Sequence, residues 1–534
     1  TMRYLLPSIL LLSIHPFVWS QDASNKQIHW EQFRGPQGNG HVNAPNLPDS
    51  WNEETNVVWK TKVHDRGWSS PVIWDEQIWM TTATNDGHKM YAVCLDKTTG
   101  KILHDIHLFD VESPQRITVD NSYATPTSVI DDKQVYVHFG TYGTACIDRI
   151  SGDIVWTRRD LNCDHEAGAG PASSPMLLGD LFIVNVDGRD VQYVIAINKH
   201  SGKTVWKTER SADFSEVPVH KRKAYSMPSL IEHNGKQQLI SNGAMGCYGY
   251  HPTTGKELWR IKHHGFSNAP RPVAGHGLVF TTVDRDDPEL WAIRLGGNGD
   301  VTNSHLAWKV TAAMPPRCSP LLVDDLLYLV NRLGIITCLD AKTGEQIWRE
   351  RLAGNFSASP IYSHGKIYLF NEDATTFILK PGRELNVLAE NKLAEDFLVA
   401  TPGVSENALF LRTEHYVYRI EKGGKRISLN DNPLGTPKAT TESFIGKWDM
   451  SRPGVPDKIA FVVTINADKT ATKSHVPSSK GKWEIVDGQL KIVWSEGWRD
   501  IIAPTKSGFR KIAFAPGNDF DDKPNNSAVA KKQK

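Results

Sequence analysis

The sequence lacks the short motifs that many enzymes and metal proteins carry. Its 534 residues contain no Cys-x-x-Cys pair, which leaves zinc and dithiol chemistry without a basis, and no Gly-x-Ser-x-Gly elbow of the hydrolase kind. The chain also has no large excess of one charge, because it contains 61 Lys and Arg residues and 60 Asp and Glu residues. The composition therefore gives no indication of a nucleic-acid partner. Beyond the N-terminal segment no apolar run reaches about 18 residues, which predicts a mature chain without a transmembrane segment.

Residues 1–20 have the features of a signal peptide. A short basic start precedes a mostly apolar stretch at 5–18, and Ser20 offers a small residue before a cleavage point at Gln21. No cysteine follows that would carry a lipid anchor. We therefore expect a periplasmic or secreted protein, with residues 21–50 as a leader segment ahead of the first domain.

A repeat of 40 to 55 residues runs through most of the chain. Each copy opens with a proline, usually after a small residue. An alternating apolar run, a polar turn and a second β-rich run follow, which together indicate a hairpin. The eight prolines are Pro71, Pro126, Pro175, Pro228, Pro272, Pro320, Pro360 and Pro402. Spacing of this regularity is typical of repeat architectures such as propellers.

The third run of each copy ends in a turn that closes on glycine. The turn reads CLDKTTG at 94–100, CIDRISG at 146–152, AINKHSG at 196–202 and CLDAKTG at 338–344, with a degenerate copy HPTTG at 251–255. Asp or Asn can accept backbone hydrogen bonds in such a turn, and glycine supplies a positive φ. A strand with a tryptophan follows, and we expect these rings to pack between neighbouring repeats. They are Trp156, Trp206, Trp259, Trp308 and Trp348.

Four short strands in each repeat predict an all-β fold. We expect an eight-bladed β-propeller of four-stranded antiparallel blades over residues 51–421. The last repeat has no fourth strand with a tryptophan, whereas a strand around Trp59 precedes the first repeat and has no partners of its own. The Trp59 strand is therefore predicted to complete the final blade and to close the ring.

The turn-plus-tryptophan pattern resembles the pyrroloquinoline quinone (PQQ) repeat, and the arrangement is similar to the PQQ-like propellers of the outer-membrane barrel-assembly lipoprotein type. Residues 30–40 (WEQFRGPQGNG) are similar to the leader before such repeats in many exported bacterial proteins. The resemblance implies a non-catalytic scaffold for protein contacts, or a ligand-binding protein, in cell-envelope biogenesis. Its partners would be envelope or extracellular proteins, or a small ligand or glycan.

Two other functions stay open. A quinoprotein dehydrogenase would need, by resemblance, PQQ with Ca²⁺ held by Glu, Asn and Asp, an Asp base, a Trp floor and a vicinal disulfide. The sequence has no Cys-Cys pair, and a solvated turn explains its densest acidic cluster, residues 284–289. We therefore predict no cofactor, no catalytic residue and no metal ligand, with a PQQ- and Ca-dependent oxidoreductase as the alternative. A carbohydrate-binding accessory protein is the other alternative.

Loops that lead into the inner strands should line one mouth of the central channel. Aromatic side chains three residues before the repeat proline, together with charged residues from nearby loops, form the predicted ligand site. The site consists of Trp68, Tyr123, His165, Glu166, Arg222, Tyr225, Arg271 and Arg317. Packing of the channel itself is the alternative explanation for these residues.

The six cysteines predict no disulfide framework, although export is expected. Cys94, Cys146 and Cys338 occupy a strand position at which another repeat has Ala196, so they should act as small buried residues. Equivalent positions of different blades do not meet, which excludes bridges among these three. A bridge between Cys318 and Cys338, which share a repeat, stays open.

The composition changes after the ring. Residues 422–442 are rich in Gly, Pro, Asn and Lys and are predicted to form a linker. Residues 443–516 alternate like short strands, and the sequence Gly446-Lys-Trp448 resembles the opening of small lipocalin-like barrels, so we expect a second, barrel-like β domain. Residues 517–534 are polar and are predicted to be a disordered tail.

Overall fold

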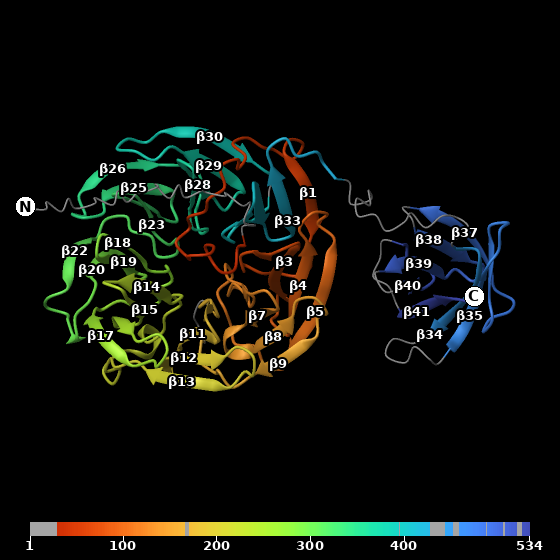
Figure 1. Cartoon of the computed structure of the whole chain (residues 1–534), viewed down its shortest axis with the longest axis horizontal. Coiled ribbons are helices and arrows are strands. Elements are labelled where there is room, and N and C mark those ends of the chain that lie inside the picture. Colours follow the sequence, from red (N-terminus) through yellow and green to blue (C-terminus); the bar gives the residue numbers. More distant parts are fainter. Residues whose placement is uncertain are drawn as a thin grey trace, which may run out of the picture. The chain divides into compact units, whose positions relative to one another are not determined.

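The computed structural model describes residues 29–165, 170–394, 396–427, 444–451, 459–486, 489–505, 508–520 and 526–533. The chain forms two compact units, divided near residue 424: a ring of β-sheets and a closed barrel (Figure 1). The predicted all-β fold, an eight-bladed propeller followed by a barrel-like domain, is confirmed. Within the described residues, no helix has the length and apolar character needed to span a bilayer.

Eight antiparallel sheets follow one another around the ring in sequence order. The first blade consists of β2 (Val72–Trp74), β3 (Gln77–Ala83), β4 (Lys89–Asp96) and β5 (Ile102–Asp110), and the second of β6 (Val129–Ile130), β7 (Gln134–His138), β8 (Thr144–Asp148) and β9 (Ile154–Arg158). The third blade consists of β10 (Met176–Leu178), β11 (Leu181–Asp187), β12 (Gln192–Asn198) and β13 (Thr204–Glu209), and the fourth of β14 (Ser229–His233), β15 (Lys236–Gly243), β16 (Gly246–Tyr250) and β17 (Glu257–Lys262). The fifth blade consists of β18 (Val273–Gly275), β19 (Leu278–Val283), β20 (Glu289–Arg294) and β22 (Leu306–Val310), and the sixth of β23 (Leu321–Val323), β24 (Leu326–Val330), β25 (Ile335–Asp340) and β26 (Gln346–Arg351). The seventh blade consists of β27 (Ile361–Ser363), β28 (Lys366–Phe370), β29 (Thr375–Leu379) and β30 (Val387–Lys392), and the eighth of β31 (Gly403–Ser405), β32 (Ala408–Arg412), β33 (Tyr416–Glu421) and β1 (Val57–Lys62). A short strand, β21 (Gly299–Asp300), pairs in parallel with β17.

The ring is closed by a strand from its own beginning. β1 pairs antiparallel with β33, so that Trp59 lies opposite Arg419 and Lys62 opposite Tyr416. The last blade therefore takes its outer strand from the segment around Trp59, where the sequence places a strand without partners. Closure of this kind holds the first and last blades together and leaves no open end in the ring.

The hydroxyl residues beside the repeat prolines link neighbouring blades. Several of these hydroxyl oxygens accept a hydrogen bond from a backbone N–H of the preceding blade, at the entrance to its inner strand. Examples are Ser70 N to Thr127 Oγ1 (3.0 Å), Thr127 N to Ser174 Oγ (2.9 Å), Ser319 N to Ser359 Oγ (3.0 Å) and Ser359 N to Thr401 Oγ1 (2.9 Å). Because these N–H groups are buried, they need such partners, which explains the small hydroxyl residue beside so many repeat prolines.

Several outer-strand tryptophans dock on the glycine turn of the next blade, whereas Trp259 donates to Gln238 Oε1 of its own blade at 2.8 Å. Trp156 donates its indole N–H to Lys199 O at 2.8 Å, and a Cβ added to Gly202 would come within 2.9 Å of the same ring. Trp308 approaches Gly344 in the same way and donates to Lys342 O at 3.1 Å. The turn glycine is therefore needed twice, for its positive φ and for the closeness of the ring.

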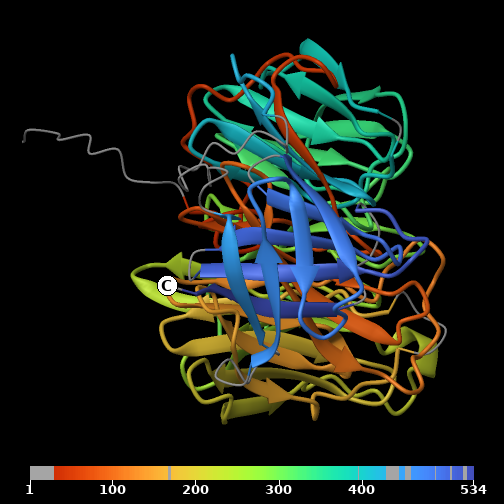
Figure 2. The same ribbon diagram turned by 90° about the vertical axis from the view of Figure 1, so that its right-hand side faces the viewer.

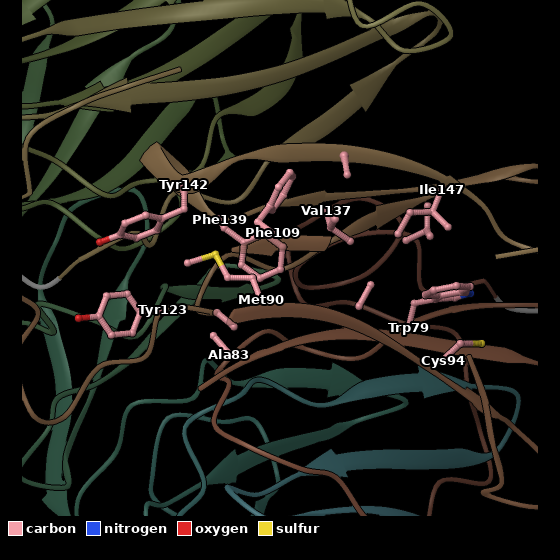
Figure 3. Close-up of a cluster of buried hydrophobic side chains, with 14 of the residues drawn as sticks. Trp79, Ala83, Met90, Cys94, Phe109, Tyr123, Val137, Phe139, Tyr142 and Ile147 are labelled. Carbon is pink, nitrogen blue, oxygen red and sulfur yellow. The ribbon is translucent and has the colours of Figure 1, made fainter. Parts of the chain in front are cut away.

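Apolar side chains fill the space between blades. Between the first two blades, Trp79, Met90 and Phe109 pack against Val137 and Phe139, and all five are 3% exposed or less (Figure 3). A full ring of such interfaces gives the propeller its core.

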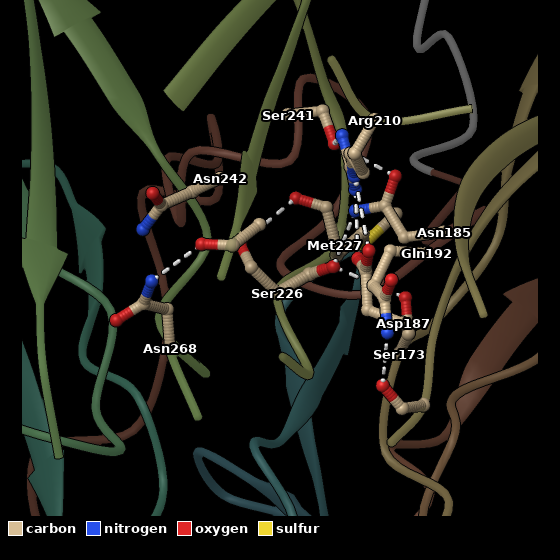
Figure 4. A network of polar contacts seen from close by, with 12 residues as sticks. Ser173, Asn185, Asp187, Gln192, Arg210, Ser226, Met227, Ser241, Asn242 and Asn268 are labelled. Atoms are coloured by element: carbon tan, nitrogen blue, oxygen red, sulfur yellow. Dashed lines mark hydrogen bonds and ion pairs between the residues drawn. The ribbon is translucent and has the colours of Figure 1, made fainter. Parts of the chain in front are cut away.

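A polar network is buried between the third and fourth blades (Figure 4). Arg210 donates from Nε and Nη2 to the two carboxylate oxygens of Asp187, at 3.0 and 2.7 Å, and both side chains are 1% exposed or less. Arg210 also donates to Ser241 Oγ at 2.8 Å, and this hydroxyl donates in turn to Asn185 Oδ1 at 2.8 Å. The paired charges are thus satisfied without water.

The second unit is a barrel of eight antiparallel strands, drawn in blue in Figure 2. They are β34 (Gly446–Ser451), β35 (Ile459–Ile465), β36 (Thr470–Lys473), β37 (Lys480–Val486), β38 (Gln489–Trp494), β39 (Arg499–Thr505), β40 (Gly508–Phe514) and β41 (Asn526–Lys532). The predicted disordered tail from residue 517 is wrong for β41, which pairs with both β40 and β34 and closes the barrel. Ala528 and Ala530 of β41 are buried, and these small side chains carry too weak an apolar signal to stand out in a polar segment. The sequence Asp487-Gly488 between two alternating runs predicts a tight hairpin, but these two residues lie outside the described ones.

Candidate functional site

The leader segment lies inside the propeller. From His29 onward it runs against the inner strands of several blades, and Figure 1 shows its red trace within the ring. Trp30 forms a bridge with Ile73 of β2, and Glu31 O accepts a hydrogen bond from Ile130 N of β6. Further along, Gly40 O accepts a hydrogen bond from Tyr362 N of β27, and Val42 N donates to Tyr362 O. The leader therefore fills part of the central channel.

The glycines of the leader allow this close fit. Gly35, Gly38 and Gly40 have φ values of 79°, 64° and 85°, in the left-handed region that favours glycine. A Cβ on Gly38 would lie 1.8 Å from the Nη1 atom of Arg271, and one on Gly40 would lie 2.7 Å from Nη2 of Arg34. A side chain at Gly38 would therefore push the leader off the Arg271 guanidinium group, and one at Gly40 would crowd Arg34 of the leader and the backbone of Pro360.

Arg271 belongs to the predicted site and joins the fifth blade to the leader. It donates from Nη1 to Phe33 O at 2.9 Å, from Nη2 to Gln32 Oε1 at 3.2 Å, and from Nε to Ser229 Oγ at 3.1 Å. Only 2% of its surface is exposed, and this burial lowers the pKa of Arg271 to about 9. Its acceptors are all uncharged, so the positive charge is solvated by dipoles alone.

Two cavities flank the leader. One, of about 750 Å³, is lined by Arg271, Ser229 and the leader residues Gln32 and Gly38. The other, of about 1110 Å³, is lined by side chains that include Trp74 of β2, Tyr362 of β27 and the leader residues His29 and His41. The His29 ring meets the Trp74 ring edge-on at 3.9 Å, and the His41 ring lies 5.0 Å from that of Tyr362.

Sequence reasoning missed this lining. Both Trp74 and Tyr362 stand two or three positions after the repeat proline, within the inner strand. An aromatic residue at this position is the sequence feature that could have predicted the lining of the cavity.

At the other end of the channel, Trp68 and Arg317 meet the same loop. Trp68 donates its indole N–H to Asp120 O at 3.2 Å, and Arg317 Nη2 donates to Asp120 Oδ2 at 2.5 Å. Partial burial opposes ionisation of Asp120, but the hydrogen bond and charge of Arg317 lower its pKa overall. Asp120 thus connects the first blade to the sixth across the channel.

Tyr123 supports this loop from beneath. Its hydroxyl donates to Gln115 O at 2.8 Å, and its ring meets that of Tyr142 edge-on at 5.6 Å. Trp68 and Tyr123 are 5% and 7% exposed, so both are largely covered by the loop that they contact. Here the structure places packing contacts at two positions predicted to bind a ligand.

His165 and Tyr225 form a third group. Their rings stack at 6.2 Å, and His165 Nε2 lies 3.1 Å from the thiol of Cys163. Burial, followed by the charge of Lys223, lowers the pKa of His165 to about 4, whereas burial raises the pKa of Cys163. Both groups are therefore neutral at pH 7, which does not suit a nucleophilic thiolate.

The eight predicted residues thus lie in separate places. Arg222 donates to Val217 O of its own loop at 2.8 Å, and Glu166 lies outside the described residues. The prediction that Arg271 shares one mouth with the others is wrong. Arg271 immediately precedes its proline, whereas Trp68 and Arg317 stand three residues before theirs, so its side chain reaches the leader instead.

Clusters that suggest metal ligands have protein partners. Asp284 accepts from Asp286 N at 2.7 Å, which makes the acidic cluster at 284–289 a turn. Elsewhere, Asp396, Glu414 and His415 lie close together. Asp396 binds His415 Nδ1 at 2.8 Å, however, and the Arg66 guanidinium lies 3.2 Å from Glu414. The six cysteines are free and buried, so Cys318 and Cys338 form no bridge.

Two carboxylates near the channel already have protein partners. Ca²⁺ is bound through six to eight oxygen ligands, several of them usually from carboxylates. Asp120 is paired with Arg317, and Glu372 accepts from Ser357 Oγ at 2.6 Å while Arg332 lies 3.8 Å away. At the leader end, the buried Arg271 adds a positive charge instead of a negative one.

Comparison with known proteins identifies relatives for the propeller. The model of the family described as outer membrane protein assembly factor BamB matches residues 50–226 and 245–380. Tetrathionate hydrolase of Acidithiobacillus ferrooxidans is 23% identical over 254 residues, which are 42% of this chain and 47% of that protein. Outer membrane protein assembly factor BamB of Legionella pneumophila is 23% identical over 204 residues, 38% of this chain and 49% of its own. The matches span about half of each relative.

Among solved structures, quinohemoprotein alcohol dehydrogenase from Comamonas testosteroni superposes with a TM-score of 0.53 at 10% identity. The superposition covers 75% of this chain and 81% of the dehydrogenase. At this low identity the likeness shows the fold alone.

The docked tryptophans, the turn glycines and the closed ring of eight blades define a PQQ-like repeat propeller. The matching family model covers more than half of the sequence, and the chain belongs to the outer membrane protein assembly factor BamB family.

Proposed function

We propose that the protein is an exported, non-catalytic scaffold that binds other cell-envelope proteins through loops at one end of its propeller. Two exposed apolar residues carry the proposal. Val119, at the tip of the loop that holds Asp120, is 89% exposed, and Leu333, beside Arg332, is 58% exposed. Arg332 lies 3.9 Å from Asp120, so the two tips belong to one surface.

This surface is held in place before any partner arrives. Arg66 Nη1 donates to Val119 O at 2.9 Å, and Arg317 fixes the neighbouring Asp120. Preorganised loops lose less conformational entropy on binding than mobile ones, which favours protein association. Membership of the BamB family supports envelope proteins as partners and the periplasm as the compartment.

The scaffold role predicts a defect in outer-membrane protein assembly. In the organism that carries the gene, deletion should lower the amount of folded outer-membrane proteins, measured by quantitative mass spectrometry of outer membranes. Wild-type protein should restore it, whereas Val119→Asp with Leu333→Asp should not, because central apolar contacts dominate interface energy. Ile150→Asp is the matched control, since Ile150 is 66% exposed on an outer turn. An unchanged membrane proteome in the deletion strain would refute the proposal.

The absence of quinone catalysis is also testable. Purified protein with PQQ and Ca²⁺ should reduce no artificial electron acceptor in the presence of alcohols or aldoses. The quinone absorption should not change in a Ca²⁺-dependent way, because the carboxylates near the channel are already paired with cations or hydroxyls. Ca²⁺-dependent turnover would establish the dehydrogenase alternative and refute a non-catalytic role.

A further inference from the structure

Two arginines are buried beside the leader without an acidic partner. Arg34 of the leader is completely buried, and it donates only to Pro360 O, at 3.3 Å, while its Nε and Nη1 atoms have no hydrogen-bond partner. Arg271 donates only to uncharged oxygens. Across the part of the chain that the structure describes, no carboxylate lies within ion-pair distance of either guanidinium group.

Such an arrangement is costly unless a negative charge offsets it. Buried ionised groups in proteins are nearly always paired with an opposite charge or a ligand, because the interior solvates an isolated charge poorly. Burial and the charge of Arg271 lower the pKa of Arg34 to about 9, which still leaves it protonated at neutral pH. The two cations therefore reinforce each other in attracting an anion.

The cavity of about 750 Å³ gives an anion access to Arg271. The three hydrogen bonds of Arg271 use three of its five N–H donors, so one on each Nη atom remains for a ligand. Gly38 packs closely on the guanidinium group and lines the same cavity with Gln32, Asn39 and Ser229, and the carboxylates of Glu31 and Glu232 also belong to its lining. Amide, hydroxyl and carboxylate groups of this kind can hydrogen-bond to the hydroxyl groups of a ligand body, while Arg271 supplies the positive charge.

We propose that this cavity binds a small hydroxylated anion, bearing a carboxylate or a phosphate ester, whose negative charge offsets Arg271 and Arg34. A guanidinium group recognises both anions through paired hydrogen bonds. The site lies at the leader end of the channel and is independent of the loop surface around Val119, so it goes beyond the scaffold role. Because the leader lines it, a bound anion also strengthens the docking of the leader in the ring.

The test is thermal unfolding of the full chain at constant ionic strength. The probes are sodium glucuronate, glucose 6-phosphate and, as the uncharged control, glucose. At least one anion should raise the melting temperature saturably, by about 2 °C or more, because it binds the native state alone. A rise with glucuronate alone identifies a carboxylate ligand, a rise with the phosphate alone a phosphate ester, and glucose should give none. No saturable rise with either anion overturns the proposal.

Three variants separate this site from a general effect of charge. Arg271→Gln and Arg34→Gln should each weaken anion binding by about tenfold or more. Arg412→Gln is the control, because Arg412 is equally buried but bonds Ser69, whereas the charge of Arg271 acts on Arg34. Neither Arg34 nor Arg412 lines the cavity, so Arg34→Gln tests the effect of its charge and not of a direct contact. An anion response that persists in both site variants, or is lost equally in the control, overturns the proposal.

The Arg34 variant also keeps the test independent of folding. Arg34 makes a single hydrogen bond, so Arg34→Gln should fold and, without ligand, should melt no lower than the wild type. Removal of an uncompensated buried charge offsets the lost bond. If Arg34→Gln instead melts several degrees lower without ligand and keeps the full anion response, its charge is not part of an anion site.

Discussion

Replacement of Arg210 by methionine is expected to lower the free energy of unfolding of the propeller by about 3–5 kcal/mol. The reason is the carboxylate left behind. Asp187 receives two hydrogen bonds from Arg210, at 2.7 and 3.0 Å, and is itself 1% exposed, so the substitution leaves a buried charge without a partner. Urea unfolding of the full chain, with midpoint and slope both recorded, measures the effect.

Two further variants show whether the charge is responsible. Lys342→Met is the control, because Lys342 pairs with Asp325 and both side chains are more than half exposed, and loss of a surface pair costs about 0–1 kcal/mol. Arg210→Met combined with Asp187→Leu should recover much of the lost stability, since no charge is then left alone. A single variant as stable as the control, or a double variant that is the least stable, contradicts the explanation.

The propeller was predictable because its signals repeat and are local. The hydroxyl residue beside the proline, as in Ser359-Pro360, marks a hydrogen bond between neighbouring blades that recurs around the ring. The turn glycine and the tryptophan of the preceding blade, such as Gly202 and Trp156, are required by one contact. Because the repeat occurs eight times, the fold can be predicted from the sequence even where one copy of the pattern is degenerate.

The site was not predictable in the same way, because its contacts join distant parts of the chain. Arg317 meets Asp120, nearly two hundred residues away, and Arg271 meets Phe33 of the leader, more than two hundred away. No repeat position encodes either pair. The leader was recognised by its pattern, but nothing in the sequence indicated that it folds back into the channel and places Arg34 beside Arg271.

The end of the barrel shows the same limit. β41 has a largely polar sequence, and among its residues whose burial is described, the small side chains of Ala528 and Ala530 mark an inward face. Pairing with β34, some eighty residues earlier, supplies what the local sequence does not. A strand that closes a barrel can be weak by itself because both of its neighbours are already in place.

Ring closure should make Trp59 the most sensitive of the docked tryptophans. Trp59→Ala is expected to lower the free energy of unfolding by about 3–5 kcal/mol, because the indole ring of Trp59 is completely buried and its N–H donates to Lys97 O of the first blade at 3.1 Å. This contact joins the first and last blades, so its loss should also raise amide hydrogen exchange in β1 and β33. Hydrogen exchange with mass spectrometry and urea unfolding measure the two effects.

Trp348→Ala is the appropriate comparison. Trp348 makes an equivalent bond to Gly382 O at 3.1 Å, but it is only partly buried and joins two blades that are consecutive in the sequence. The chain itself keeps those two blades together when the indole ring of Trp348 is lost. The final blade and the first are joined instead by β1 and by side-chain contacts such as Arg412 with Ser69 and Lys97 with Glu406. The loss should therefore be smaller, with faster exchange confined to β26 and the adjacent turn. Equal costs for the two variants, with no faster exchange in β33, would mean that the circle of blades is stable without the closing strand.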